Sequence, residues 1–254
     1  MPTPAYDSVT FGAAILAGAV NSVAGGGSLI TFPTLVWLGL PPLTANATNT
    51  AALWPGALGS MWGYRRELAS TEKQMYLLIV PSFAGGLAGA LLLRLTPAPL
   101  FDRLVPLLVL FATLLFMAQE PIQRMLGHHP HGSRSPRWFW AAGLFQLLVG
   151  VYGGYFGAGI GILMLAALSI LGGDDIHQMN GLKNLLGMSI NGIAAVYFIV
   201  MHMVSWREAL IMAAGSIVGG LAGARVARRM GRPAVRRMVV AIGLSMAAGL
   251  MLRL

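Results

Sequence analysis

The chain has 254 residues, of which 56% are hydrophobic and 10% carry a charge. Soluble domains carry about 25% charged residues, so this composition excludes an ordinary globular protein. The net charge of +9 could suggest a nucleic-acid partner, but apolar stretches recur too often for a water-exposed binding surface, and we expect no nucleic-acid partner. The absence of cysteine excludes disulfide, iron–sulfur and thiolate–zinc chemistry. The composition therefore predicts an all-α, polytopic protein of the lipid bilayer.

Apolar segments follow one another along the whole chain, and we expect a single transmembrane domain over 1–254. The segments cover residues 8–23, 29–40, 43–63, 75–95, 100–118, 137–156, 160–171, 177–202, 208–226 and 234–252. A helix needs about 20 residues to cross a hydrocarbon core of about 30 Å. Segments 29–40 and 160–171 reach only about 18 Å and are predicted to be half-helices. Residues 1–10 contain no Lys or Arg, so we expect the first segment to be retained and not cleaved as a signal peptide.

The sequence contains an internal repeat. The hexapeptide Gly-Gly-Leu-Ala-Gly-Ala at 85–90 returns at 219–224, an offset of 134, and the glycine-rich stretch at 25–27 matches 157–159 at an offset of 132. We therefore expect two repeated units, 8–118 and 137–252, joined by a basic linker loop at 119–136. Each unit would hold a glycine-broken helical hairpin followed by three transmembrane helices.

The distribution of Lys and Arg predicts how the two units are oriented. If each broken hairpin returns to its own side, each unit crosses the membrane three times and the second unit is inverted. One face of the protein then carries 13 Lys and Arg residues and the other carries 4, an asymmetry that the positive-inside rule favours. The interpretation is two inverted repeats with both termini outside, unless the six arginines of 225–237 alone create the bias.

The two glycine breaks are candidate binding elements. Non-helical backbone at membrane depth must be buried in protein or line a wet cavity. The helices that begin after the breaks would point their positive N-terminal ends at the membrane interior, which favours an anion. We expect substrate ligands from Asn21, Ser22, Gly25, Gly26, Gly27 and Ser28 in the first break and from Tyr155, Gly157 and Gly159 in the second. The alternative is that these glycines only allow close helix packing.

A polar stripe lies on the helix that follows each break. The stripes consist of Asn46, Asn49 and Thr50 in the first unit and of Asn180, Lys183 and Asn184 in the second. The ammonium of Lys183 is the sharpest candidate, because a charge inside an apolar helix needs a partner. That partner is a bound anion, a salt bridge to Asp174 or Asp175, or water reached by snorkelling to the interface.

Other polar and aromatic residues are expected to have structural roles. The tryptophans near predicted segment ends are interpreted as anchors at the membrane interface, and they are Trp54, Trp62, Trp138, Trp140 and Trp206. The histidines lack the partners of a metal site, so the sequence predicts neither a metal nor another cofactor.

The glycine motifs resemble those of a known family. The run from Asn21 to Pro33, followed by Ala-Asn-Ala-Thr-Asn-Thr at 45–50, closely resembles the sulfite exporter TauE/SafE family of membrane permeases, and 153–159 is similar to that family's second glycine motif. The resemblance covers nearly the whole chain. It implies a protein of the bacterial inner (cytoplasmic) membrane that moves a small sulfur-containing anion, such as sulfite, sulfate or an organosulfonate.

Together these features lead to the hypothesis of a secondary transporter with an anion site at the interface of the repeats, working by alternating access. We expect no enzyme, because no nucleophile, base or set of metal ligands converges in the predicted membrane segments. An anion channel and a membrane scaffold or partner protein without transport are the alternatives. The sequence indicates no particular oligomeric state.

Overall fold

A computed structural model describes residues 4–23, 26–63, 65–69, 71, 73–126, 136–170, 176–230 and 232–252. Within these ranges the chain is helical and contains no strand, which confirms the all-α prediction. The helices are α1 (Pro4–Val23), α2 (Ser28–Trp37), α3 (Pro42–Gly63), α4 (Arg65–Ala69), the 3₁₀ helix η1 (Lys73–Leu78), α5 (Ile79–Leu95), α6 (Ala98–Leu126), α7 (Pro136–Tyr155), α8 (Ile160–Ile170), α9 (Ile176–Val200), α10 (Trp206–Met230) and α11 (Arg232–Met251).

The two glycine breaks interrupt the helices at corresponding places. Break one is the stretch between α1 and α2, of which the structure describes Gly26 and Gly27, and break two comprises residues 156–159, between α7 and α8. The helices that follow have 10 and 11 residues, and at about 1.5 Å per residue both are too short to cross a membrane. The two segments predicted as half-helices are therefore short helices in the structure, α2 and α8.

The boundaries differ from the prediction in the middle of the chain. Helix α6 has 29 residues and ends at Leu126, so residues 119–126, expected as the start of the linker loop, are helical. Apolar residues give way to polar ones at 119–126, but this change of composition does not end a helix by itself. Residues 127–135 of the expected loop, including its three histidines, lie outside the described residues.

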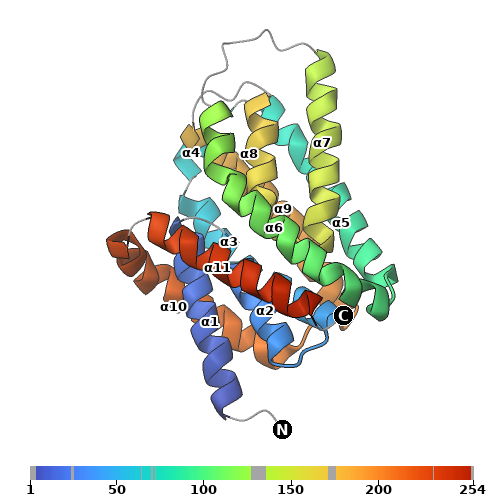
Figure 1. The fold of residues 1–254 in the computed structure, drawn as a ribbon. Helices are drawn as coiled ribbons and strands as arrows, with labels where there is room; N and C mark the ends of the chain where they lie inside the picture. Colours follow the sequence, from blue (N-terminus) through green and yellow to red (C-terminus); the bar gives the residue numbers. More distant parts are fainter. Residues whose placement is uncertain are drawn as a thin grey trace.

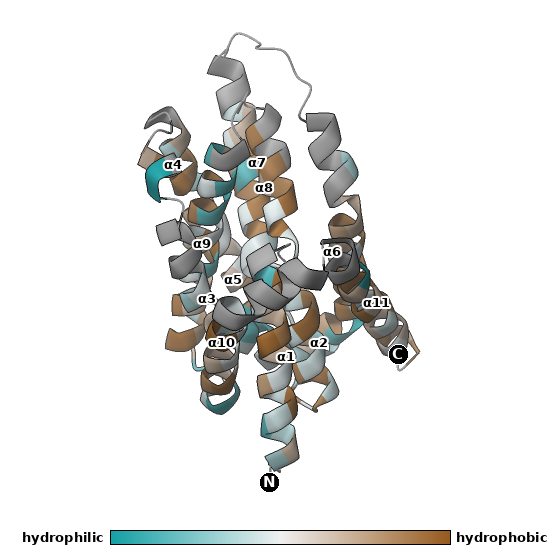
Figure 2. Cartoon of the chain, turned by 90° about the vertical axis from the view of Figure 1, so that its left-hand side faces the viewer, coloured by the Kyte–Doolittle hydropathy of each residue, from teal (hydrophilic) through white to brown (hydrophobic). Residues whose placement is uncertain are grey.

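Three helical stretches of the described chain are long and apolar enough to span a membrane, namely Met75–Leu95, Ala98–Ala118 and Gln178–Val200. They coincide with three of the predicted crossings. Large apolar side chains along the helices are exposed, with Val80 68% and Leu210 64% accessible. Figure 2 shows apolar residues along many of the helices. Such a surface is unusual in water and expected in contact with lipid.

Helices of the two predicted units interleave. Helix α1 packs against α10, and α5 packs against α7, so the first helix of each unit lies along the fourth predicted segment of the other. Helices α3 and α9 pack against each other between these pairs (Figure 1). The repeated hexapeptide lies in these contacts: a Cβ on Gly219 would overlap the carbonyl oxygen of Ile15, and one on Gly89 would overlap that of Val151.

The first helices of the two units run in opposite directions. In Figure 1, α1 rises from the N-terminus at the bottom, whereas α7 descends from the top of the bundle. The short helices lie in different halves of the bundle, α2 in the lower part and α8 in the upper part of both Figure 1 and Figure 2. The two breaks consequently lie between these halves, in the interior of the bundle.

Candidate functional site

Break one is held by hydrogen bonds within its own unit. Gly26 has a φ of +89°, a conformation that favours glycine. The amide N–H of Gly27 donates to Asn21 Oδ1 at 2.7 Å. The next amides are also used, because those of Leu29 and Ile30 donate to the carbonyl oxygens of Gly26 and Gly27 at 2.9 Å. The N-terminal end of α2 is therefore largely capped by the chain itself.

Break two has a more open helix start. Gly157 and Gly159 have φ values of +80° and +79°, and the Tyr152 hydroxyl donates to the carbonyl oxygen of Ala158 at 2.7 Å. Within the described chain, the first α8 amide that finds an acceptor is that of Ile162, which donates to Gly159 O at 3.1 Å. The first N–H groups of a helix have no intrahelical acceptor, so α8 presents amides that a ligand could use.

The two breaks lie close together on α6. A Cβ on Gly26 would come within 2.8 Å of the Phe116 ring, and one on Gly159 would lie 3.6 Å from Ala112 O, one turn earlier. The rings of Phe32 in α2 and Phe156 in break two also meet edge to face, with centroids 5.1 Å apart. The structure thus brings the starts of both half-helices to one place, as the sequence predicts.

The polar stripe of α3 divides between the two breaks. Asn49 is 3% exposed, and its Oδ1 accepts a hydrogen bond from the Thr31 hydroxyl of α2 at 2.5 Å. Asn46 is 1% exposed and points to the other unit, where its Nδ2 donates to Tyr155 O at 2.8 Å. Thr50 donates back to Asn46 O. This stripe ties α3 to the half-helix of its own unit and to break two.

Lys183 lies at the start of α8. A Cβ on Gly161 would be 3.3 Å from Lys183 Cδ, so the aliphatic part of the lysine covers the first turn of that helix. The ammonium donates to Asn180 Oδ1 at 3.1 Å. Asn184 follows on α9 and is half-buried. Asp174 and Asp175, the alternative partners, lie outside the described residues.

The stripes of α3 and α9 do not form one cluster. Thr48 accepts a hydrogen bond from the amide of Ser205 at 2.9 Å, beyond the C-terminal end of α9. Lys183 lies near the other end of α9, 17 residues before Val200, or about 25 Å along the helix. Asn46 and Lys183 therefore adjoin break two at its two ends, next to Tyr155 and Gly161.

The remaining expected ligands have varied positions. The hydroxyl of Tyr155 lies 3.4 Å from Thr96 Oγ1 at the end of α5, so its carbonyl, and not its phenol, meets Asn46. Ser28 is the first residue of α2 and is half-buried. Gly25 and the side chain of Ser22 lie outside what the structure describes.

Trp54 differs from its expected role as an interface anchor. It lies in the interior of α3, its Nε1 is buried, and a Cβ on Gly192 of α9 would come within 2.7 Å of that nitrogen. The signal that could have indicated this is its spacing, because it follows Asn46 and Thr50 at i+8 and i+4 on one helical face.

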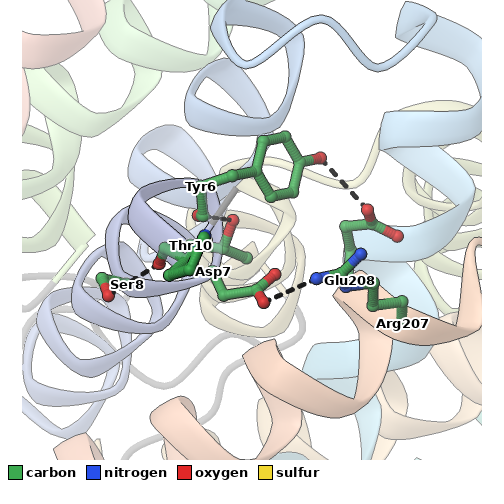
Figure 3. A network of polar contacts seen from close by, with 7 residues as sticks. Tyr6, Asp7, Ser8, Thr10, Arg207 and Glu208 are labelled. Atoms are coloured by element: carbon green, nitrogen blue, oxygen red, sulfur yellow. Dashed lines mark hydrogen bonds and ion pairs between the residues drawn. The ribbon is translucent and has the colours of Figure 1, made fainter. Parts of the chain in front are cut away.

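A polar network that the sequence analysis missed joins α1 to α10 (Figure 3). Glu208 is 6% exposed and accepts hydrogen bonds from the hydroxyls of Tyr6, at 3.1 Å, and Ser205. Beside it, Asp7 and Arg207 form an ion pair at 2.7 Å. Burial and the neighbouring Glu208 raise the pKa of Tyr6 to about 12. The Ser-x-x-Glu spacing at 205–208 is a helix-start signature that could have indicated Glu208.

Comparison with known proteins agrees with this fold. The profile of the family described as sulfite exporter TauE/SafE matches residues 10–250. A probable membrane transporter protein of Haemophilus influenzae is 28% identical over 245 residues, covering 95% of this chain and 92% of the relative. The probable membrane transporter protein YfcA of Escherichia coli K12 is 30% identical over 261 residues, covering 99% and 91%. No solved structure matches the chain.

These matches define the class as that of membrane transporters. The chain belongs to the sulfite exporter TauE/SafE family, as its glycine motifs predict.

Proposed function

We propose that the protein is a multi-pass secondary transporter of the bacterial inner membrane that moves a small sulfur oxyanion, such as sulfite, sulfate or an organosulfonate. The family supports transport. The oxyanion is supported by the chemistry of break two, where a helix N-terminus and a lysine lie together. Helix starts attract anions through their free amides and the helix dipole.

The single observation that carries the proposal is the position of Lys183 against Gly161, in the first turn of α8. The described partner of its ammonium is the neutral Asn180 Oδ1. Among the described residues, no negative charge compensates this half-buried ammonium, and an anion at the start of α8 would compensate it. Break two is the better candidate than break one, because Asn21 already caps the latter.

Alternating access is supported by the arrangement of the helices. The contacts of α1 with α10 and of α5 with α7 correspond to each other when the two units are exchanged, and α1 and α7 run in opposite directions in Figure 1. We infer two inverted repeats that rock against each other around break two. An inside-negative potential would favour export of a monoanion by about 2.3 kcal/mol per 100 mV.

Flux of labelled sulfite into proteoliposomes tests the proposal. We expect saturable flux with the wild-type protein and at least tenfold weaker half-saturation with Lys183→Ala, because a charge-assisted hydrogen bond contributes about 1.5–3 kcal/mol. The matched control is Lys73→Ala, which removes the chain's other lysine and should leave flux unchanged. Unchanged affinity and flux in Lys183→Ala would contradict the role of Lys183. Saturable binding without flux would indicate a scaffold, and flux without saturation would indicate a channel.

A further inference from the structure

The side chain of Asn46 carries a buried oxygen atom without a described partner. Its residue is 1% exposed, and its Oδ1 has no hydrogen-bond partner among the described residues. The two ends of an amide side chain are assigned from their partners. Here the assignment is unambiguous, because the other end meets the carbonyl oxygen of Tyr155 at 2.8 Å and a carbonyl only accepts hydrogen bonds. The end that meets it must be the NH₂ group, so the atom without a partner is the acceptor.

A buried acceptor without a donor is costly in the folded protein. Asn46 also contacts break two directly, since Tyr155 is the last residue before it. The same face of α3 carries a second atom of this kind, the indole Nε1 of Trp54, which is a buried donor without a partner in the described chain. Gly192 keeps this nitrogen free of a neighbouring side chain. Trp54 follows Asn46 by eight residues, or about 12 Å along α3, so a small anion meets only one of these atoms at a time, and Asn46 is the one next to break two.

We propose that the transported anion carries a hydrogen-bond donor, such as a hydroxyl group, and gives it to Asn46 Oδ1. This inference rests on the proposed function and specifies its substrate class. A donor-free oxyanion such as sulfate has only acceptor oxygens and would meet the Asn46 carbonyl with like partial charge. A hydroxylated sulfonate, or an oxyanion that keeps a proton, satisfies the carbonyl.

Two sulfonates of similar size test this directly. The compounds 2-hydroxyethanesulfonate and 1-propanesulfonate are tested as inhibitors of labelled sulfite flux in proteoliposomes. They differ in one group, which is a hydroxyl in the first and a methyl in the second. For the wild-type protein we expect the hydroxylated compound to inhibit at about tenfold lower concentration, since a site built around a polar group rejects analogues that leave it unpaired.

Single-residue variants test whether Asn46 is the source of the preference for the hydroxylated sulfonate. Asn46→Leu should abolish the preference, so that the two sulfonates inhibit this variant at about the same concentration. Gln146→Leu is the matched control, because Gln146 is 0% exposed and its Oε1 also lacks a described partner, but it lies between α5 and α7 on Ser82. It should keep the full preference.

The outcomes separate the inference from the proposed function. Equal inhibition of the wild-type protein by the two sulfonates, or inhibition by neither, would overturn the inference while transport of sulfite stands. A preference that survives in Asn46→Leu would overturn the assignment to Asn46. Absence of any saturable sulfite flux would overturn the proposed function itself. The wild-type comparison needs no variant, so a failure of Asn46→Leu to fold does not affect it.

Discussion

At the scale of single residues, corresponding positions in the two units have different tasks. Asn49 and Lys183 match in the repeat, yet Asn49 bonds to Thr31 inside its own unit, whereas Lys183 lies on Gly161 with its charge next to an open helix start. The first position contributes to stability, and the second is the one that we propose for an anion. Divergence of this kind is expected when a duplicated unit keeps its fold but needs only one binding site.

The hydrogen bond between Thr31 and Asn49 should therefore matter for stability. Thr31→Val leaves Asn49 Oδ1 buried without its donor, and we expect the free energy of unfolding to fall by about 1–3 kcal/mol. The measurement is thermal or denaturant unfolding in detergent. Thr34→Val on the same helix removes a hydroxyl that only donates to Ile30 O of the preceding turn, and it should change stability by less than about 1 kcal/mol. Equal losses in the two variants would contradict this role of Asn49.

At the scale of elements, glycines set the distance between helices. Both copies of the repeated hexapeptide face the first helix of the other unit. Gly85 and Gly89 approach the backbone of α7, and Gly219 approaches the backbone of α1. Small residues let helix backbones come together where lipid gives no hydrophobic drive for association. The glycines of the hexapeptide therefore act as packing residues. Close helix packing was the alternative role considered for the glycines of the two breaks.

Adjacent glycines provide a test of this packing. Gly219→Ala places a methyl group on the carbonyl oxygen of Ile15, whereas a Cβ on Gly220 meets nothing within 4 Å. We expect Gly219→Ala to destabilise the protein by about 1–3 kcal/mol through overpacking. Gly220→Ala should be neutral or stabilising by up to about 1 kcal/mol, because alanine favours a helix. Thermal unfolding of both variants checks this, and similar values would contradict close packing of α1 on α10.

Much of the fold could be predicted from the sequence, because lipid restricts the chain to helices and glycine breaks are visible as motifs. The positions of α2 and α8 followed from their short apolar runs. The site could be predicted only in part. Spacing placed Asn46 and Lys183 on their helices. It could not reveal that Asn46 lies near one end of α9 and Lys183 near the other, since that depends on how α3 packs on α9. The interior position of Trp54 and the buried Glu208 likewise depend on neighbours distant in the sequence.

At the scale of the whole molecule, the account requires two units of opposite orientation. The absence of cysteine makes the topology accessible to single-cysteine labelling without background. In intact cells, we expect Pro97→Cys and His202→Cys to react with a membrane-impermeant maleimide from outside. Ser133→Cys, in the basic loop between the units, should react only after permeabilisation. Labelling of Ser133→Cys in intact cells, together with Pro97→Cys, would contradict the inverted arrangement.

The central claim is that an oxyanion binds at the start of α8, next to Lys183. Crystals or frozen samples of the protein with selenite, a heavier analogue of sulfite, test it most directly through anomalous scattering or density. We expect a peak within hydrogen-bond distance of the Ile160 and Gly161 amides and of the Lys183 ammonium, and we expect it to disappear in Lys183→Ala. A peak at break one instead, or none at break two at saturating selenite, would contradict it.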